Sequence, residues 1–193
     1  TRTVPTRTVP TRTVPTRTTL EAPQAGTATD TVTAVSSRSG KRAVVNGTVT
    51  EDGLAQVVVM RGDKETRFDT TEVERISWGG VSAAMREADV YFGRGDFENA
   101  AAKYRLATDA EQREVVQAVA RRRTGESLMR LGATDPSKFA EAVAEFDRFI
   151  SDYPKNRALP QVRWMKARAA LLGGDAATAA TEFGALCNEG AGT

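Results

Sequence analysis

The hydrophobic and polar positions of this chain follow one period up to about residue 80 and a different period after it. In the first part, apolar and polar residues alternate in short runs separated by turns, which is typical of antiparallel strands. The strands predicted from this alternation cover residues 31–35, 43–49, 55–60, 65–68 and 72–78. Four or five short strands at about ten-residue spacing indicate a small antiparallel barrel or curled sheet. The Asn46–Gly47 pair falls inside the second strand and predicts a bulge or bend there.

From residue 82 onward the apolar residues recur at helical spacing, and Ala, Glu, Arg and Leu dominate. The segments with this spacing are 82–94, 97–108, 111–131, 138–153, 159–172 and 176–188. They predict six helices arranged as three hairpins. Asp96, Asp135 and Asp175 lie just before helix starts, where a carboxylate can accept hydrogen bonds from unpaired N–H groups. The predicted fold class is therefore α+β, with a sheet part followed by a helical part.

The helical half contains an internal repeat. Each hairpin has a glycine in its turn, a small residue early in its second helix, and an aromatic residue four positions later. These positions are Gly95, Gly132 and Gly174, then Ala100, Ala142 and Ala179, then Tyr104, Phe146 and Phe183. The small residue allows two helices to approach closely, and the aromatic ring fills the gap between hairpins. The glycines are 37 and 42 residues apart, and the longer interval contains an insertion near residues 133–137.

This repeat resembles the tetratricopeptide repeat, whose period is about 34 residues. The spacing of Phe146, Phe149, Tyr153 and Pro154 is similar to a subclass with an "F..F…YP" ending that is common in bacterial envelope proteins. The resemblance covers residues 82–188. It implies a solenoid of three helical hairpins that acts as a protein-interaction scaffold and has no catalytic residues. More loosely, residues 31–78 resemble small SH3-like or Sm-like β-barrels.

The resemblance also implies a concave groove lined by the first helix of each hairpin. Its inward positions would be Met85, Asp89 and Phe92, then Arg122, Glu126 and Met129, then Trp164, Arg168 and Leu171. Apolar anchors with arginine and glutamate around them suit an extended peptide ligand. The alternative is a groove that neighbouring elements fill or that is only solvated.

The first eighteen residues repeat the unit TRTVP three times and then begin it again. This segment has four arginines, three valines and no acidic residue, so it has too little apolar surface to form its own core. Threonine and valine favour extended backbone, and the prolines exclude helix. We therefore predict an extended arm that binds a partner subunit through Arg2, Val4, Pro5, Arg7, Val9, Pro10, Arg12, Val14, Pro15 and Arg17. A solvated linker or a glycosylated stalk is the alternative interpretation.

The composition of the chain argues against several classes of function. The net charge of the 193 residues is +2, and the arm's four arginines alone exceed it, so the rest of the chain lacks the basic surface of a nucleic-acid binder. The chain has no histidine and a single cysteine, Cys187, which excludes histidine-dependent triads and Cys-based zinc sites. It also has no phosphate-binding loop of the GxxxxGK[ST] type. We therefore expect no enzyme activity, no metal and no cofactor. Cys187, beside Leu186, is interpreted as a half-buried apolar residue.

Arginines cluster at Arg121–Arg123, with Arg113 and Arg130 nearby. A helix directs these side chains to different faces, and glutamates lie among them. This pattern favours a solvated helix with intrahelical ion pairs over a phosphate site.

The predicted organisation has three parts: an arm and linker at 1–30, a small β domain at 31–80, and a helical repeat domain at 81–193. No apolar run approaches the roughly 20 residues that a membrane-spanning helix needs. Because the chain begins at Thr1, we expect either a mature end from which a signal peptide was removed or a truncated chain.

We expect a structural scaffold, extracellular or in the bacterial cell envelope, that binds copies of itself. Unlike end faces of a solenoid can join head to tail, and such contacts can form a filament with the arm bound to a neighbouring subunit. The main alternative is an envelope adaptor that binds a different protein or peptide in its groove. An enzyme whose chemistry lies in a missing part of the chain is a third reading.

Overall fold

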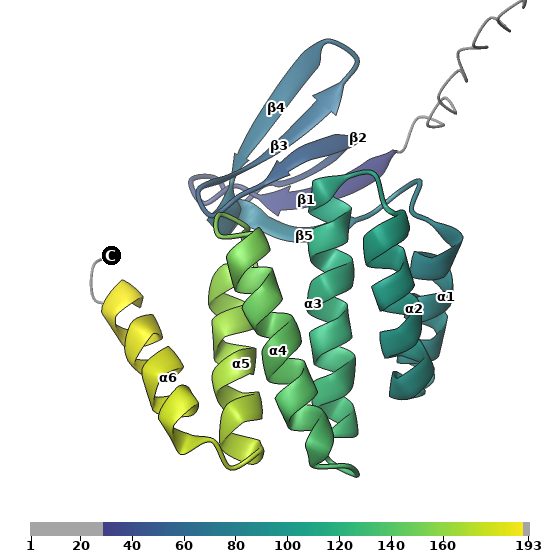
Figure 1. Cartoon of the computed structure of the whole chain (residues 1–193). Coiled ribbons are helices and arrows are strands. Elements are labelled where there is room, and N and C mark those ends of the chain that lie inside the picture. Colours follow the sequence, from purple (N-terminus) through teal and green to yellow (C-terminus); the bar gives the residue numbers. More distant parts are fainter. Residues whose placement is uncertain (1–28, 191–193) are drawn as a thin grey trace, which may run out of the picture.

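The computed structural model describes residues 29–190, in which a five-stranded antiparallel sheet precedes six helices (Figure 1). The strands are β1 (Asp30–Val35), β2 (Arg42–Asp52), β3 (Gln56–Arg61), β4 (Lys64–Asp69) and β5 (Val73–Ser77). A short 3₁₀ turn, Thr70–Glu72, connects β4 to β5. The α+β class and the five strands predicted from the alternating pattern are confirmed.

The strand order in the sheet is β4-β3-β2-β1-β5, so β4 and β5 form its two edges. The alternating valines explain why this sheet forms. Val32, Val49, Val57 and Val59 are at most 1% exposed and pack together on one face. Burying four such side chains provides most of the apolar surface that holds the sheet together.

β2 is longer than predicted because two strands pair with it in succession. β1 pairs with residues 42–47, and β3 pairs with residues 48–52. The ladder is regular at Asn46 and Gly47, and the register shift falls between Val49 and Glu51, so the predicted site of the bulge is wrong. Gly47 has a different role: a Cβ atom there would lie 2.4 Å from the carbonyl oxygen of Met60.

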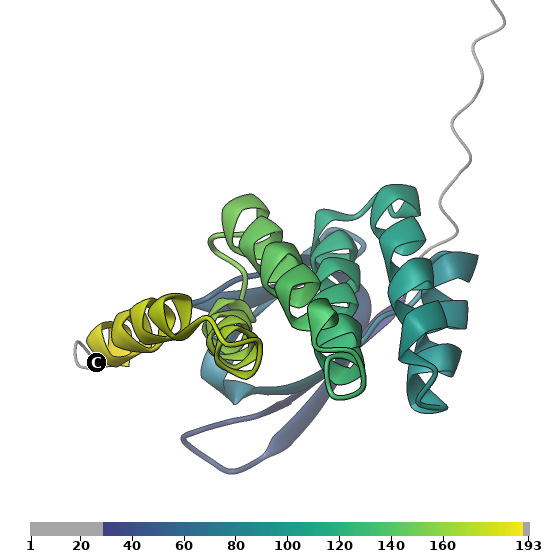
Figure 2. The same ribbon diagram turned by 60° about the horizontal axis from the view of Figure 1, so that its bottom comes forward.

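The helices are α1 (Ala83–Gly93), α2 (Phe97–Ala110), α3 (Glu114–Leu131), α4 (Ser137–Asp152), α5 (Leu159–Leu172) and α6 (Ala176–Gly190). Each helix packs against the next one in the chain. Figure 2 shows them succeeding one another across the molecule, from α1 at one side to α6 at the other. The six predicted helices are confirmed.

Asp96 and Asp175 accept hydrogen bonds at the starts of α2 and α6 as predicted, whereas the cap residue of α4 is Pro136 and Asp135 lies one position before it. Asp96 accepts a hydrogen bond from the N–H of Asn99, Asp175 from that of Thr178, and Asp135 from that of Ser137, the first residue of α4. These carboxylates satisfy N–H groups that have no partner inside the helix.

The small residues of the sequence repeat are buried, as their role predicts. Ala100 and Ala142 are fully buried, Ala179 is 3% exposed, and the rings of Tyr104 and Phe146 are fully buried. Two clusters result, one formed by α1 and α2 with Ala120 of α3, and the other by α3, α4 and α5 with Ala101 of α2.

A buried aspartate at the start of β1 joins the sheet to the helices. The Asp30 carboxylate accepts hydrogen bonds from the N–H groups of Val49 (2.8 Å) and Gly79 (2.7 Å) and from the guanidinium of Arg113 (2.7 Å). Arg113 immediately precedes α3 and also donates to the carbonyl oxygen of Gly79. The charge of Asp30 is thus paired and hydrogen-bonded, as burial requires.

Candidate functional site

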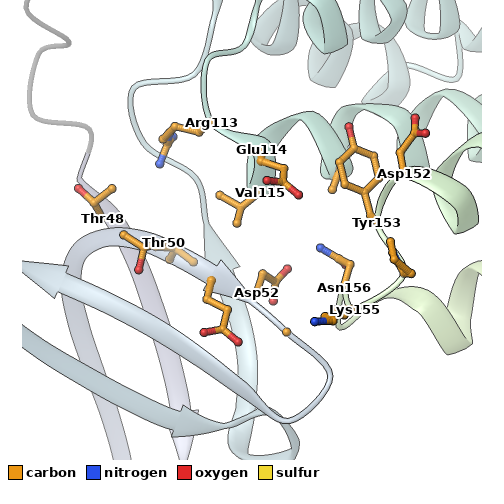
Figure 3. Close-up of a pocket in the computed structure, with 15 residues that line it drawn as sticks. Thr48, Thr50, Asp52, Arg113, Glu114, Val115, Asp152, Tyr153, Lys155 and Asn156 are labelled. Atoms are coloured by element: carbon orange, nitrogen blue, oxygen red, sulfur yellow. The ribbon is translucent and has the colours of Figure 1, made fainter.

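A cleft of about 610 Å³ lies between β2, the start of α3 and the loop that connects α4 to α5 (Figure 3). One wall is the strand itself, from Thr48 to Gly53. The facing walls are α3 and the "YP" loop of the sequence motif. Their lining residues are Arg113, Glu114, Val115, Ala118, Asp152, Tyr153, Pro154, Lys155 and Asn156.

The cleft exists because β2 continues five residues beyond the end of β1. The last β1–β2 pair is Asp30 with Gly47, and no strand within residues 29–190 pairs with residues 49–52 on the side away from β3. The Asp30 carboxylate occupies the N–H of Val49 at one end of this edge. The segment of β2 from Val49 to Asp52 is a short strand edge that faces the helices, and a strand edge can pair with an added extended chain.

At its other end the edge is closed by the α4–α5 loop. The N–H of Arg157 donates to the carbonyl oxygen of Asp52 (2.9 Å), and the guanidinium of Arg157 donates to the Asp52 carboxylate (2.7 Å). The N–H of Leu54 donates to the carbonyl oxygen of Lys155 (2.9 Å). These bonds fix the loop against the sheet, so both walls of the cleft are rigidly placed.

Acidic residues outnumber basic ones around the cleft. Its lining contains four acids, Glu51, Asp52, Glu114 and Asp152, and two bases, Arg113 and Lys155. Arg113 pairs with Asp30, Asp52 with Arg157, and Asp152 with Arg121. Glu51 and Glu114 then remain against Lys155, which is an excess of one negative charge. Glu114 makes no ion pair with any residue between 29 and 190, and it is exposed. A small negative excess of this kind favours a cationic ligand over an anionic one.

Tyr153 belongs to the floor of the cleft and not to its chemistry. Its side chain packs against Phe149, with ring centroids 5.3 Å apart, and the residue is 8% exposed. Burial raises the pKa of the Tyr153 hydroxyl, so it stays protonated at neutral pH. With Val49, Val115 and Pro154 it supplies the apolar part of the cleft surface.

The predicted groove is only partly available to a ligand. Met85 is 3% exposed in the cluster between α1 and α2, so its assignment to the groove surface is wrong: the position faces the partner helix. Asp89 accepts a hydrogen bond from the buried hydroxyl of Tyr104 (2.6 Å). Phe92 is half-buried beneath the guanidinium of Arg123, which lies 4.9 Å from the ring centroid.

The other predicted groove positions differ between α3 and α5. On α3, Glu126 accepts from Arg123 (3.0 Å), and Met129 is partly buried against the core. On α5, Trp164 is 46% exposed and Leu171 is 55% exposed, with the guanidinium of Arg168 lying 5.4 Å from the Trp164 ring. Arg122 is half-buried and lines a separate cavity. The arm residues between Arg2 and Arg17 lie outside the described part of the chain.

The arginine cluster makes ion pairs within α3 and also between α3 and α4. Glu126 is the shared partner of Arg122, Arg123 and Arg130 on α3, which confirms the intrahelical pairs predicted there. Arg121 instead reaches α4, at 3.6 Å from Asp152. The sequence did not indicate Arg113 as the partner of a buried aspartate, because the two residues are 83 positions apart.

Some negative findings concern the described residues alone. Residues 29–190 contain no group of three or more acidic or cysteine side chains that could hold a metal ion. None of their helices is long and apolar enough to cross a membrane. Cys187 is exposed on α6, so its interpretation as a half-buried residue is wrong.

Family models, curated proteins and solved structures were each compared with the chain, and none of the three gives a match.

Proposed function

We propose that this protein is a structural scaffold that assembles with copies of itself, and that the TRTVP arm of one copy lies in the β2 cleft of the next. The observation that carries the proposal is the cleft itself. It presents a strand edge and an excess of acidic residues, and the arm of the same chain has four arginines, no acidic residue and a sequence that predicts extended backbone. Electrostatic attraction and strand pairing would then act together.

The period of the arm fits the length of the edge. Successive prolines, such as Pro5 and Pro10, leave four residues with backbone N–H groups between them. The edge from Val49 to Asp52 is also four residues long when both ends are counted, although the N–H of Val49 and the carbonyl oxygen of Asp52 are already hydrogen-bonded. Proline cannot donate to a strand ladder, so a unit of this length is the longest uninterrupted pairing the arm allows. Arginine and valine in each unit would meet Glu114 and the apolar wall.

The reach of the arm favours binding between subunits. Eighteen extended residues span about 60 Å, which is enough to cross a neighbouring small domain. Because the unit is repeated, one arm can bind a cleft in several equivalent positions, and this raises the effective concentration of binding units at the cleft.

The helices support the solenoid part of the proposal. Each helix packs on its chain neighbours, α1 and α6 stand at opposite ends, and the buried alanines recur in each hairpin. We interpret the array as three hairpins like tetratricopeptide repeats. Its unlike ends could join head to tail, and such a contact forms a filament unless its rotation closes a ring. A bacterial envelope or extracellular location is proposed from the resemblance of the "YP" motif alone.

Sedimentation velocity and electron microscopy test this function. Removal of residues 1–18 should leave the circular dichroism spectrum of the folded part unchanged and weaken assembly, as should raised salt. Glu114→Lys should weaken assembly in the same way, whereas Asp63→Lys, an equal charge change in the exposed β3–β4 turn, should not. Assembly of the truncated chain at the strength of the full chain would refute the proposal. If the truncation acts and Glu114→Lys does not, the arm binds elsewhere.

A groove-binding adaptor is the second candidate. The exposed Trp164 and Leu171 on α5 favour it, because large exposed apolar side chains mark binding surfaces. Trp164→Ala should leave self-assembly intact and abolish binding of a peptide ligand, which separates the two functions.

A further inference from the structure

A second cavity, of about 190 Å³, lies between β5, α3 and the start of α5. Its polar lining consists of Asp52, Trp78, Arg122, Asn156, Arg157 and Gln161. Two of these residues are cationic and one is anionic. A cavity with surplus positive charge, several hydrogen-bond donors and a partly apolar wall has the composition of a small-ligand site.

Arg122 is the cation in this cavity that is paired only at long range, with Glu126 at 3.7 Å. Its side chain is 17% exposed and donates no hydrogen bond to any residue between 29 and 190. The nearest carboxylate is that of Glu126, at 3.7 Å, and this carboxylate already accepts from Arg123 at 3.0 Å and lies 4.0 Å from Arg130. One carboxylate therefore serves three guanidinium groups.

Arg157 does not relieve this imbalance, because it is a second cation and its ion-pair partner is Asp52. Its Nε donates to Asp52, and its Nη1 donates to the carbonyl oxygen of Val73 (3.4 Å). Burial, together with the neighbouring charge of Arg123, lowers the pKa of Arg122. The site is thus electrostatically unfavourable to the cation that it contains, and an anion beside Arg122 would reverse this.

We propose that this cavity binds a small oxyanion, a carboxylate or a phosphate, with the guanidinium of Arg122 as the main donor. A planar guanidinium presents paired N–H groups that match two oxygens of such a group. The side-chain oxygen of Asn156 accepts from the N–H of Ala158, so its NH₂ group and that of Gln161 are further donors around the same space. Water has a liquid volume of about 30 Å³ per molecule, so the cavity has room for an ion of several heavy atoms.

Water alone would fill the space and accept hydrogen bonds, but it would not supply the missing negative charge. An oxyanion does both. It would also touch residues of the sheet and of two helices, so it would fasten the two parts of the molecule to each other. This site is independent of the arm and its cleft, and neither proposal requires the other.

The experiment uses Trp78 as a reporter. Trp78 lines the cavity, and the second tryptophan, Trp164, is removed by Trp164→Phe. The full chain with this change is titrated with sodium phosphate, sulfate or acetate, and sodium chloride keeps the ionic strength constant. We expect a saturable change in Trp78 emission with at least one oxyanion and a melting temperature that rises with its concentration. Phosphate and acetate distinguish a phosphate ligand from a carboxylate ligand.

Arg122→Gln in the same background should abolish both responses. The matched control is Arg130→Gln, which removes another partner of Glu126 from outside the cavity and should keep them. Arg122→Lys retains the charge without the planar fork and should weaken binding at least tenfold, which provides a second variant if the glutamine chain is unfolded by circular dichroism. An unchanged response in either Arg122 variant, or no saturable response to any of the three oxyanions, would overturn the proposal.

Discussion

Replacing Asp30 by alanine should destabilise this protein more than almost any other single change to a polar residue. The Asp30 side chain is fully buried and accepts three hydrogen bonds, from Val49, Gly79 and Arg113. Asp30→Ala removes the acceptor of all three hydrogen bonds at once. The N–H groups of Val49 and Gly79 and the guanidinium of Arg113 then have no carboxylate partner. The side chain of Arg113 is only 21% exposed, so water replaces that partner poorly.

The magnitude follows from these contacts. Removing one partner of a buried ion pair costs about 3–5 kcal/mol, because the remaining charge is left uncompensated. A typical domain is stable by about 5–15 kcal/mol, so the variant should lose a large share of its stability. With a urea dependence of about 2 kcal/mol per molar, the unfolding midpoint should fall by about 1–3 M.

Urea titrations followed by circular dichroism measure this change. A double-mutant cycle with Arg113→Met isolates the pair, and the double variant should be less destabilised than the sum of the single variants. Glu74→Ala, which breaks the exposed Arg42–Glu74 pair on the same sheet, is the control and should move the midpoint little. A urea midpoint for Asp30→Ala within about 0.5 M of that of the parent chain would show that Asp30 does not join the sheet to the helices.

Two further predictions concern packing and pH. Ala142→Phe places a ring at a fully buried helix contact and should cost on the order of 1–3 kcal/mol or more, so an unchanged melting temperature would show that the repeat register is wrong. Burial raises the pKa values of Tyr104 and Tyr153 above the ordinary value of about 10, so the unfolded chain loses these protons first as the pH rises. Below about pH 10, the pKa of an unfolded tyrosine, these two residues should leave the free energy of unfolding unchanged, and above it they should lower it. Tyr104→Phe should make this fall shallower, as measured by urea midpoints at several pH values above 10 (about the unfolded pKa). An equal slope in the variant and the parent chain would contradict the prediction.

The elements of this fold could be predicted from the sequence because their signals are local. Alternating valines such as Val57 and Val59 mark a strand, and the aspartates before α2 and α6 mark helix starts. The buried alanines could be predicted too, since the repeat compares one part of the chain with another. Each of these inferences uses residues that are neighbours or that recur at a fixed interval.

The contacts that build the cavities carry no such signal. The Asp30–Arg113 pair joins residues 83 positions apart, and the Asp52–Arg157 pair joins residues 105 positions apart. In the sequence Asp52 has the appearance of an ordinary turn residue, and Arg113 falls in a predicted helix although it precedes α3 in extended conformation. The burial of Met85 is likewise a matter of which face of α1 meets α2, which the helical period alone leaves open.

Both cavities have one structural origin, the difference in length between β1 and β2. β1 has six residues and β2 has eleven, so β2 passes beyond its neighbour and ends at Asp52, against the α4–α5 loop. The cleft runs along this overhang, and the smaller cavity also touches Asp52 and Asn156. A change at Asp52 would release Arg157 and disturb both spaces together. Glu114 lines the first alone and Arg122 the second alone, and for this reason substitutions at these two residues separate arm binding from anion binding.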